Sequence, residues 1–152
     1  MDIKITPSFL GGSIDIPPSK SISHRALIAA ALASGESTVE NLLDCADTDA
    51  TVEALTALGA KIERCGNSAK ITGISKPNKQ VKINCRESGS TLRFMIPVAA
   101  ALGADSEFSG SGKLPERPIT PFFELLPEHG VQFLTKQMPY RINGRLNGGS
   151  FP

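Results

Sequence analysis

Residues 17–25 read Pro-Pro-Ser-Lys-Ser-Ile-Ser-His-Arg, and this stretch marks the start of a positively charged helix. The two prolines disfavour helix before this point, and Ser19 or Ser21 is a good N-cap. Backbone N–H groups at a helix N-terminus attract anions, and Lys20 and Arg25 add two cationic side chains about one turn apart. A Ser-capped helix with solvated basic residues explains the same pattern, so this stretch alone leaves both interpretations open.

A second helix start has the same design. Residues 86–93 read Arg-Glu-Ser-Gly-Ser-Thr-Leu-Arg. Gly89 allows a ligand to approach the backbone closely, Ser90 can cap the helix, and Arg93 follows one turn later. Glu87 fits a plain cap through its interaction with the helix dipole. Two helices that begin in this way at matching points of a repeat favour an anion-binding function.

The two helices belong to a repeated unit with the order strand, helix, strand, helix, strand, strand. Both contain the run Ala-Ala-Ala-Leu, and Gly59 and Gly130 end the second helix of each copy in the position of a left-handed C-cap. The predicted elements are strand 14–16, helices 21–33 and 90–102, strands 37–39 and 106–108, helices 50–58 and 119–129, strands 60–63 and 131–134, and strands 70–73 and 141–144.

The start of the unit is also marked. Gly-Gly-Ser at 11–13 precedes the first predicted strand, and Gly-Gly-Ser recurs at 148–150. This recurrence predicts that a third unit begins at 148–152. Repeated units need neighbours to cover their apolar faces, so we expect exposed core surface through which copies could associate.

A third basic segment lies in a predicted loop. Residues 111–119 read Ser-Gly-Lys-Leu-Pro-Glu-Arg-Pro-Ile. Pro118 keeps Arg117 out of a helix and fits the first turn of the next one. Arg117 is therefore expected at a junction from which it could point into a cleft, although a lone arginine there is commonly a surface residue.

The composition is that of an ordinary globular domain. The chain has 152 residues, 40% of them hydrophobic and 20% charged, and its formal net charge is +1. This balance gives no support for nucleic acid or membrane as a partner, and the absence of tryptophan argues against base stacking. The N-terminus lacks a signal-peptide pattern, and the apolar run Ile96–Leu102 is too short to span a bilayer. We therefore expect a cytoplasmic protein.

Metal and redox sites are not favoured, and we expect neither a metal nor a cofactor. The three cysteines form no C-x-x-C pair and are interpreted as small buried residues in a reducing compartment. They are Cys45, Cys65 and Cys85. His24 could act as a general acid or base, but we expect it to be a partly exposed helical residue. His24 and His129 are too few for a His-rich metal site. The acidic residues of 44–49 are best explained as a helix start capped by Asp47 or Thr48.

Five landmarks run in order between Gly12 and Gly149: G-x-I-x-I-P-x-S-K-S-I-S-H-R-A-L, N-L-L-x-x-x-D-T, L-x-x-L-G-A, E-S-G-S-T-x-R and L-x-x-R-P-I. Together they resemble the N-terminal part of the 3-phosphoshikimate 1-carboxyvinyltransferase (EPSP synthase) family. Two alternatives are a fragment of the enolpyruvyl transferase that acts on UDP-N-acetylglucosamine, and a non-catalytic anion-binding or scaffold domain. The transferase that acts on UDP-N-acetylglucosamine usually has Lys-Asn where this chain has Lys-Ser at residues 20–21.

The resemblance implies an α/β (α+β) fold of β-α-β-α-β-β units, the enolpyruvyl transferase (EPT/RTPC-like) fold, here with an incomplete domain. Residues 1–12 would be a strand region that belongs to the missing C-terminal domain. Residues 13–147 would form two units of the N-terminal substrate-binding domain, and residues 148–152 would start a truncated third unit.

The implied reaction transfers the enolpyruvyl group of phosphoenolpyruvate to the 5-hydroxyl of shikimate 3-phosphate, on the route to chorismate and the aromatic amino acids. The implied contacts with shikimate 3-phosphate are Lys20, Ser21 and Arg25; those with phosphoenolpyruvate are Lys20, Gly89 and Arg117; Arg93 is a supporting charge. Lys20 could also move protons. The catalytic Asp and Glu would lie outside this chain, so the chain alone is expected to be inactive. Many members carry Asn where this chain has Glu87, which affects the fine geometry near Gly89.

Overall fold

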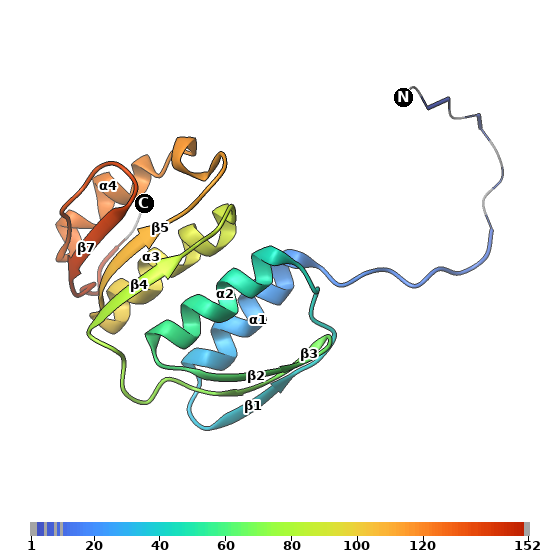
Figure 1. The fold of residues 1–152 in the computed structure, drawn as a ribbon, viewed down its shortest axis with the longest axis horizontal. Coiled ribbons are helices and arrows are strands. Elements are labelled where there is room, and N and C mark those ends of the chain that lie inside the picture. Colours follow the sequence, from blue (N-terminus) through green and yellow to red (C-terminus); the bar gives the residue numbers. More distant parts are fainter. Residues whose placement is uncertain (1–2, 5, 8, 10, 151–152) are drawn as a thin grey trace.

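The computed structural model describes residues 3–4, 6–7, 9 and 11–150 of the chain. The parts of the predicted regions 1–12 and 148–152 that fall on positions 1–2, 5, 8, 10, 151 and 152 lie outside the described residues. The described residues before Ser19 form an extended segment that leads away from the rest of the molecule (Figure 1).

Helices and strands alternate along the chain in a mixed α/β arrangement. In chain order the elements are α1 (Lys20–Leu32), β1 (Glu36–Val39), α2 (Ala46–Leu58), β2 (Lys61–Cys65), β3 (Ser68–Thr72), β4 (Gln80–Asn84), α3 (Gly89–Leu102), β5 (Asp105–Ser109), the 3-10 turn η1 (Leu114–Glu116), α4 (Thr120–Leu125), the 3-10 turn η2 (Pro127–His129), β6 (Val131–Phe133) and β7 (Tyr140–Gly144).

The strands form two sheets. The first has three strands in the order β1-β3-β2, all antiparallel, with Val39 of β1 opposite Ala69 of β3. The second has four strands in the order β4-β5-β7-β6, in which β4 and β5 are parallel and the other pairs antiparallel. Helices α1 and α2 lie against the first sheet; α2 also contacts both α3 and strand β4, and α3 packs against the second sheet at β5 and β7 (Figure 1).

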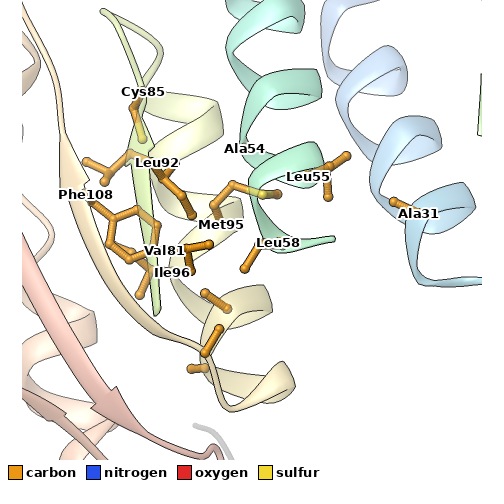
Figure 2. Packing of buried hydrophobic residues seen from close by; sticks show 14 of the residues in the cluster. Ala31, Ala54, Leu55, Leu58, Val81, Cys85, Leu92, Met95, Ile96 and Phe108 are labelled. Carbon is orange, nitrogen blue, oxygen red and sulfur yellow. The ribbon is translucent and has the colours of Figure 1, made fainter. Parts of the chain in front are cut away.

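Helix α3 is the centre of the core (Figure 2). Its residues Leu92, Met95 and Ile96 are fully buried, and this spacing places them on one face of a helix. Phe108 of β5 is buried on the sheet side, and Leu55 of α2 is buried on the helix side. Removing a side chain of this size from such a core costs about 2–5 kcal/mol. The core therefore fixes α2 and α3 relative to each other.

One predicted strand is wrong. Residues 14–16 form no strand, and Ile14 and Ile16 are 85% and 79% exposed. A strand needs a hydrogen-bonding edge and a surface to bury its apolar side chains, and none of the described residues provides these for 14–16. The first copy of the repeat thus has the order helix, strand, helix, strand, strand, whereas the second copy is complete.

The predicted helix 119–129 is also wrong in its length. It is divided into α4 and η2, which meet at Leu126 and Pro127. A proline inside a helix cannot donate its backbone hydrogen bond and clashes with the preceding turn, so Pro127 starts a new short segment. The predicted left-handed C-caps are confirmed, since φ is 118° at Gly59 and 88° at Gly130.

Two of the predicted N-caps differ from the structure. Helix α2 starts at Ala46 with Cys45 as its N-cap, so neither Asp47 nor Thr48 caps it; the Cys45 N–H instead donates to Thr48 Oγ1 at 3.3 Å. In α3 the cap is Ser88, whose Oγ accepts from the Thr91 N–H at 3.1 Å, and not Ser90. Each helix begins earlier than predicted because the cap depends on local backbone geometry that several polar residues could provide.

The cysteines differ in burial. Burial is complete for Cys85 and raises the pKa of its thiol to about 12, whereas Cys45 is half-buried and Cys65 is exposed. The prediction of buried cysteines is therefore right for Cys85 and wrong for Cys65. Within the described part of the chain, no helix has the length and apolar character needed to cross a membrane.

Candidate anion-binding site

Lys20 is the first residue of α1 and lies next to the start of α2. Its Nζ donates to Asp47 Oδ2 at 2.8 Å, while half of its side-chain surface remains exposed. The hydrogen bond to Asp47 and the charge of that carboxylate raise the pKa of Lys20 above the ordinary 10.5, although partial burial and the charge of Arg117 act in the opposite direction. Lys20 is therefore charged at neutral pH and accessible to a ligand.

Two guanidinium groups meet over Gly89, the first residue of α3. A Cβ at this position would lie 2.6 Å from Arg117 Nη1 and 2.8 Å from Arg93 Nη1. Arg93 Nη1 also donates to the Gly89 carbonyl oxygen at 3.4 Å. Only glycine leaves room for both groups, which explains this residue at the start of a helix.

The loop that carries Arg117 is attached to the start of α3. The Ser111 N–H donates to the Arg86 carbonyl oxygen at 2.7 Å, and the Glu87 carboxylate lies against Gly112. Glu87, expected to alter the anion site, thus contacts the loop that leads to Arg117. Lys20 is linked to the same end of α3 through Asp47, whose carboxylate accepts from Lys20 Nζ and whose carbonyl oxygen lies 3.2 Å from Thr91 Oγ1.

Arg25 lies further along α1. Its Nη1 donates to the Ser21 carbonyl oxygen at 3.1 Å, and its guanidinium carbon lies 5.2 Å from the centre of the Phe94 ring on α3. A cation over an aromatic face gains about 0.5–1 kcal/mol at an exposed site. Arg25 is thereby held toward α3, the helix that carries Arg93.

The charges at this end of the molecule are not balanced. Within residues 3–4, 6–7, 9 and 11–150, none of Arg25, Arg93 and Arg117 forms an ion pair, and Lys20 pairs with Asp47. Unpaired guanidinium groups are suited to bidentate contacts with phosphate or carboxylate. The described residues contain no group of three or more His, Cys, Asp or Glu that could hold a metal.

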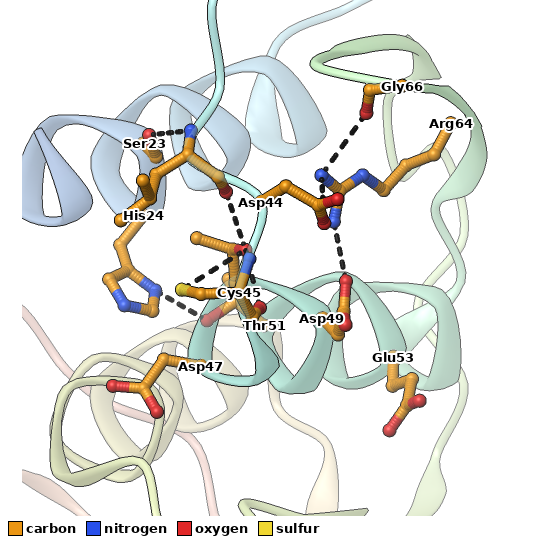
Figure 3. Close-up of polar contacts among 12 residues, drawn as sticks. Ser23, His24, Asp44, Cys45, Asp47, Asp49, Thr51, Glu53, Arg64 and Gly66 are labelled. Atoms are coloured by element: carbon orange, nitrogen blue, oxygen red, sulfur yellow. Dashed lines mark hydrogen bonds and ion pairs between the residues drawn. The ribbon is translucent and has the colours of Figure 1, made fainter. Parts of the chain in front are cut away.

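In contrast to these unpaired arginines, arginines in a neighbouring cluster around α2 form ion pairs with carboxylates (Figure 3). Arg64 Nη1 lies 2.5 Å from Asp49 Oδ1, and its Nη2 lies 3.3 Å from Asp44 Oδ1. Arg86 Nη2 lies 2.6 Å from Glu53 Oε1. These arginines are neutralised by carboxylates and connect α2 to β2 and to the loop before α3. The acidic segment 44–49 therefore serves ion pairing and the start of α2.

His24 is completely buried, so the prediction of partial exposure is wrong. Its Nδ1 lies 2.7 Å from Thr51 Oγ1 (Figure 3), and Thr51 Oγ1 lies 2.8 Å from Thr91 Oγ1. Thr91 Oγ1 lies 2.8 Å from Ser88 Oγ, the cap of α3. This chain of side chains joins the N-terminal halves of α1, α2 and α3 and ends at Ser88, the residue before Gly89.

The sequence profile of the family described as EPSP synthase (3-phosphoshikimate 1-carboxyvinyltransferase) matches residues 5–151. The chain belongs to the EPSP synthase family. The resemblance found in the five sequence landmarks is thereby confirmed.

Individual members of the EPSP synthase family agree with this assignment. The 3-phosphoshikimate 1-carboxyvinyltransferase of Clostridium kluyveri is 43% identical over 98% of this chain, and that of Clostridioides difficile is 36% identical over 98%. The structure of EPSP synthase from Acinetobacter baumannii superposes with a TM-score of 0.78 at 26% identity over 92% of this chain. The predicted fold class is confirmed.

This EPSP synthase family chain spans about a third of its relatives. It covers 36% of the Clostridium kluyveri protein and 34% of the Acinetobacter baumannii chain. The predicted incompleteness of the domain is thereby confirmed, whereas the boundaries at residues 12 and 147 stay predictions.

Of the predicted site residues, the structure brings Gly89, Arg93 and Arg117 into contact and relates Lys20 to Arg117 through charge. Ser21 contributes its carbonyl oxygen to Arg25 and is exposed. The sequence did not reveal Asp47 as the partner of Lys20, because its acidic segment also fits a helix start. The individual substrate contacts stay predictions.

Proposed function

We propose that this chain forms one wall of the site in which an enolpyruvyl group passes from phosphoenolpyruvate to the 5-hydroxyl of shikimate 3-phosphate. Membership of the EPSP synthase family supports the reaction. The observation that carries the proposal is the convergence of Arg93 and Arg117 over Gly89, near Lys20 and without a neutralising carboxylate on either arginine among the described residues.

The charges of the two substrates are opposite in sign to those of the cationic side chains. Both are multiply anionic, and guanidinium forks and helix N-termini are suited to phosphate and carboxylate groups. Shikimate 3-phosphate would contact Lys20, Ser21 and Arg25 along α1. Phosphoenolpyruvate would lie between Lys20 and the start of α3, with Arg117 as its main contact and Arg93 in support.

The reaction proceeds by addition and elimination. The 5-hydroxyl oxygen bonds to C2 of phosphoenolpyruvate, the hydroxyl proton is lost, and a proton adds to C3. The bond from C2 to the phosphate oxygen then breaks, phosphate leaves, and loss of a proton from C3 restores the double bond. Fixed cations favour the departure of phosphate because they stabilise its developing charge.

The remainder of the site would come from the C-terminal domain of such an enzyme, which carries the other half of the substrate contacts. The reaction would take place in the cytoplasm, where free cysteines stay reduced. Exposed apolar residues such as Ile22 and Leu32 of α1 offer surface for that domain, or for a second copy when it is absent.

Titration of the chain with each substrate, followed by NMR, tests the proposal. Lys20→Ala and Arg25→Ala should each weaken binding of shikimate 3-phosphate by about tenfold or more, the effect of removing one charge-assisted contact. Arg117→Ala should weaken binding of phosphoenolpyruvate to a similar degree. Lys70→Ala and Arg141→Ala are matched controls, because both side chains are exposed and ion-paired elsewhere in the fold. Equal affinities across wild type, site variants and controls would refute the assignment.

A further inference from the structure

His24 is a buried polar residue that the proposed reaction does not use. It follows Lys20 by one turn of α1, and its ring is fully inaccessible. Its Nδ1 contacts Thr51, but its Nε2 has no hydrogen-bond partner among the described residues. Buried polar atoms are satisfied in the great majority of cases, so this arrangement requires an explanation.

A series of hydrogen-bonded hydroxyl groups connects His24 Nδ1 to the first turn of α3. From Thr51 the chain of hydroxyl groups passes through Thr91 to Ser88, with each separation 2.8 Å. Thr91 Oγ1 also lies 3.2 Å from the carbonyl oxygen of Asp47. Ser88 directly precedes Gly89, over which the two guanidinium groups meet. His24 is therefore the α1 end of a polar connection whose α3 end is the anion site.

The orphaned Nε2 indicates where the ring proton lies. A buried N–H without an acceptor is rarer in proteins than a buried acceptor without a donor. A neutral ring with its proton on Nδ1 leaves only a lone pair at Nε2. The Nδ1–H then donates to Thr51, the Thr51 hydroxyl donates to Thr91, and the Thr91 hydroxyl donates to Ser88 Oγ or to the Asp47 carbonyl oxygen.

We propose that His24, as the neutral Nδ1–H tautomer, is a positioning residue that holds the first turn of α3, and with it Gly89, in register with Lys20 on α1. The ligand named here rests on the proposed function. Loss of the His24 contact should weaken binding of phosphoenolpyruvate, which would contact Gly89 and Arg117. It should leave shikimate 3-phosphate, expected along α1, largely unaffected.

The variants His24→Asn and His24→Leu form a matched pair. Asparagine and leucine have the same shape, so both lose the same part of the ring volume, but only asparagine places a polar atom where Nδ1 was. Loss of packing therefore affects both variants, and the hydrogen bond to Thr51 distinguishes them.

The expected result is a difference in affinity for one ligand only. In NMR titrations of the chain, His24→Leu should bind phosphoenolpyruvate about tenfold more weakly than wild type, the effect of about one hydrogen bond, and His24→Asn should recover most of this loss. Affinity for shikimate 3-phosphate should change by less than about twofold in either variant. Equal phosphoenolpyruvate affinities for His24→Asn and His24→Leu would overturn the proposal.

Two measurements without ligand separate this inference from the proposed function. The ¹⁵N shifts of the His24 ring should show a protonated Nδ1 and an unprotonated Nε2, and a protonated Nε2 would overturn the proposal. The amide signals of Ser88 and Gly89 should match wild type in His24→Asn and move in His24→Leu; unchanged signals in both would also overturn it. If wild type binds neither substrate, the proposed function fails while these two results still decide the role of His24.

Discussion

A side chain at position 89 would collide with the two guanidinium groups that meet there. In Gly89→Ala the new methyl group would displace Arg117 and Arg93, whose nearest atoms lie at the ends of flexible side chains. The fold should therefore survive, with a free energy of unfolding within about 1 kcal/mol of wild type in urea denaturation. Affinity for phosphoenolpyruvate in NMR titration should fall about tenfold, because the arginines move away from the bound anion.

Gly148→Ala is the control for this substitution. Gly148 has open space around its Cα and no positive φ, so the same change should leave both stability and affinity unaltered. Wild-type affinity for phosphoenolpyruvate in Gly89→Ala would show that the two guanidinium groups do not hold the ligand at this turn.

Because His24 is buried, the free energy of unfolding should decrease as the pH is lowered. Desolvation lowers the pKa of His24 below the ordinary 6.5; the charges of Lys20 and Arg25 on α1 act in the same direction, and Asp47 on α2 opposes them. From α3 the ring faces Phe94, which carries no charge. Below pH 6.5 the unfolded chain takes up the proton first, so the free energy of unfolding should fall as the pH falls toward the lowered pKa.

Urea denaturation between pH 7.5 and about 5 measures this effect, by comparison with His24→Asn. The variant cannot titrate at this position, but it keeps His129 and every carboxyl group of the chain. Wild type should therefore lose more stability than the variant over this interval. Parallel curves for the two proteins would show that the His24 ring takes up a proton equally well in the folded and unfolded states.

Sequence and structure agree best where one residue type has one physical use. Gly89 at a helix start and Arg117 before a proline were visible in the local pattern, although a plain helix cap and a surface arginine also fitted it. Asp47 and His24 were misjudged because their roles depend on partners distant in sequence: Lys20 and Asp47 are 27 positions apart, as are His24 and Thr51. Nothing in the local pattern distinguishes such residues from a helix cap or a surface histidine.

At the scale of elements, the loop between β4 and α3 contains a residue with strained backbone, Arg86, whose side chain forms ion pairs with α2. Arg86 has φ of 51°, a region that favours glycine, and its guanidinium group contacts Glu53 and Asp49 on α2. Arg86→Ala should lower the free energy of unfolding by about 0.5–1 kcal/mol, because it loses these partly exposed pairs and keeps the strain. Arg86→Gly loses the same pairs but relieves the strain, and should be about 1 kcal/mol more stable than Arg86→Ala.

Urea denaturation of the two variants measures this difference directly. Lys70→Ala, which removes the exposed pair with Glu36 from the first sheet, controls for the loss of a surface ion pair alone. An Arg86→Gly variant that is less stable than Arg86→Ala would contradict the assignment of strain to this position.

The sequence predicted the elements that depend on local interactions, and it failed for strands that depend on distant partners. Serine caps after prolines, the runs Ala-Ala-Ala-Leu and the C-cap Gly59 located α1, α2 and α3 to within a few residues, because a helix is built from local hydrogen bonds. The strand expected at 14–16 failed because a strand depends on a partner edge, which no local signal provides. β4 was not located for the same reason: its place is set by parallel pairing with β5, across the whole of α3.

At the scale of the whole molecule, one end of the helical layer collects cations that no described carboxylate neutralises, apart from Lys20. Arg25 on α1, Arg93 on α3 and Arg117 in the following loop converge although the chain as a whole has a net charge of only +1. Placing like charges together costs free energy, and an anionic ligand recovers it. The balanced composition therefore gave no sign of this cluster of cationic side chains, which the fold brings together from distant parts of the sequence.

The chain should bind substrate weakly and release no phosphate when it is mixed with shikimate 3-phosphate and phosphoenolpyruvate. It spans 36% of its Clostridium kluyveri relative, and its cationic wall is exposed to solvent on the side away from the core. Addition of a hydroxyl group to phosphoenolpyruvate needs acid and base groups within about 3 Å of the reacting atoms and exclusion of water, and neither is expected of one wall alone. A colorimetric phosphate assay measures the outcome, with the full-length Clostridium kluyveri protein as the positive control. Phosphate release by the chain well above that of a Lys20→Ala, Arg117→Ala double variant would mean that the catalytic groups lie within these residues, and His24, Asp47 and Glu87 would then be the first to test.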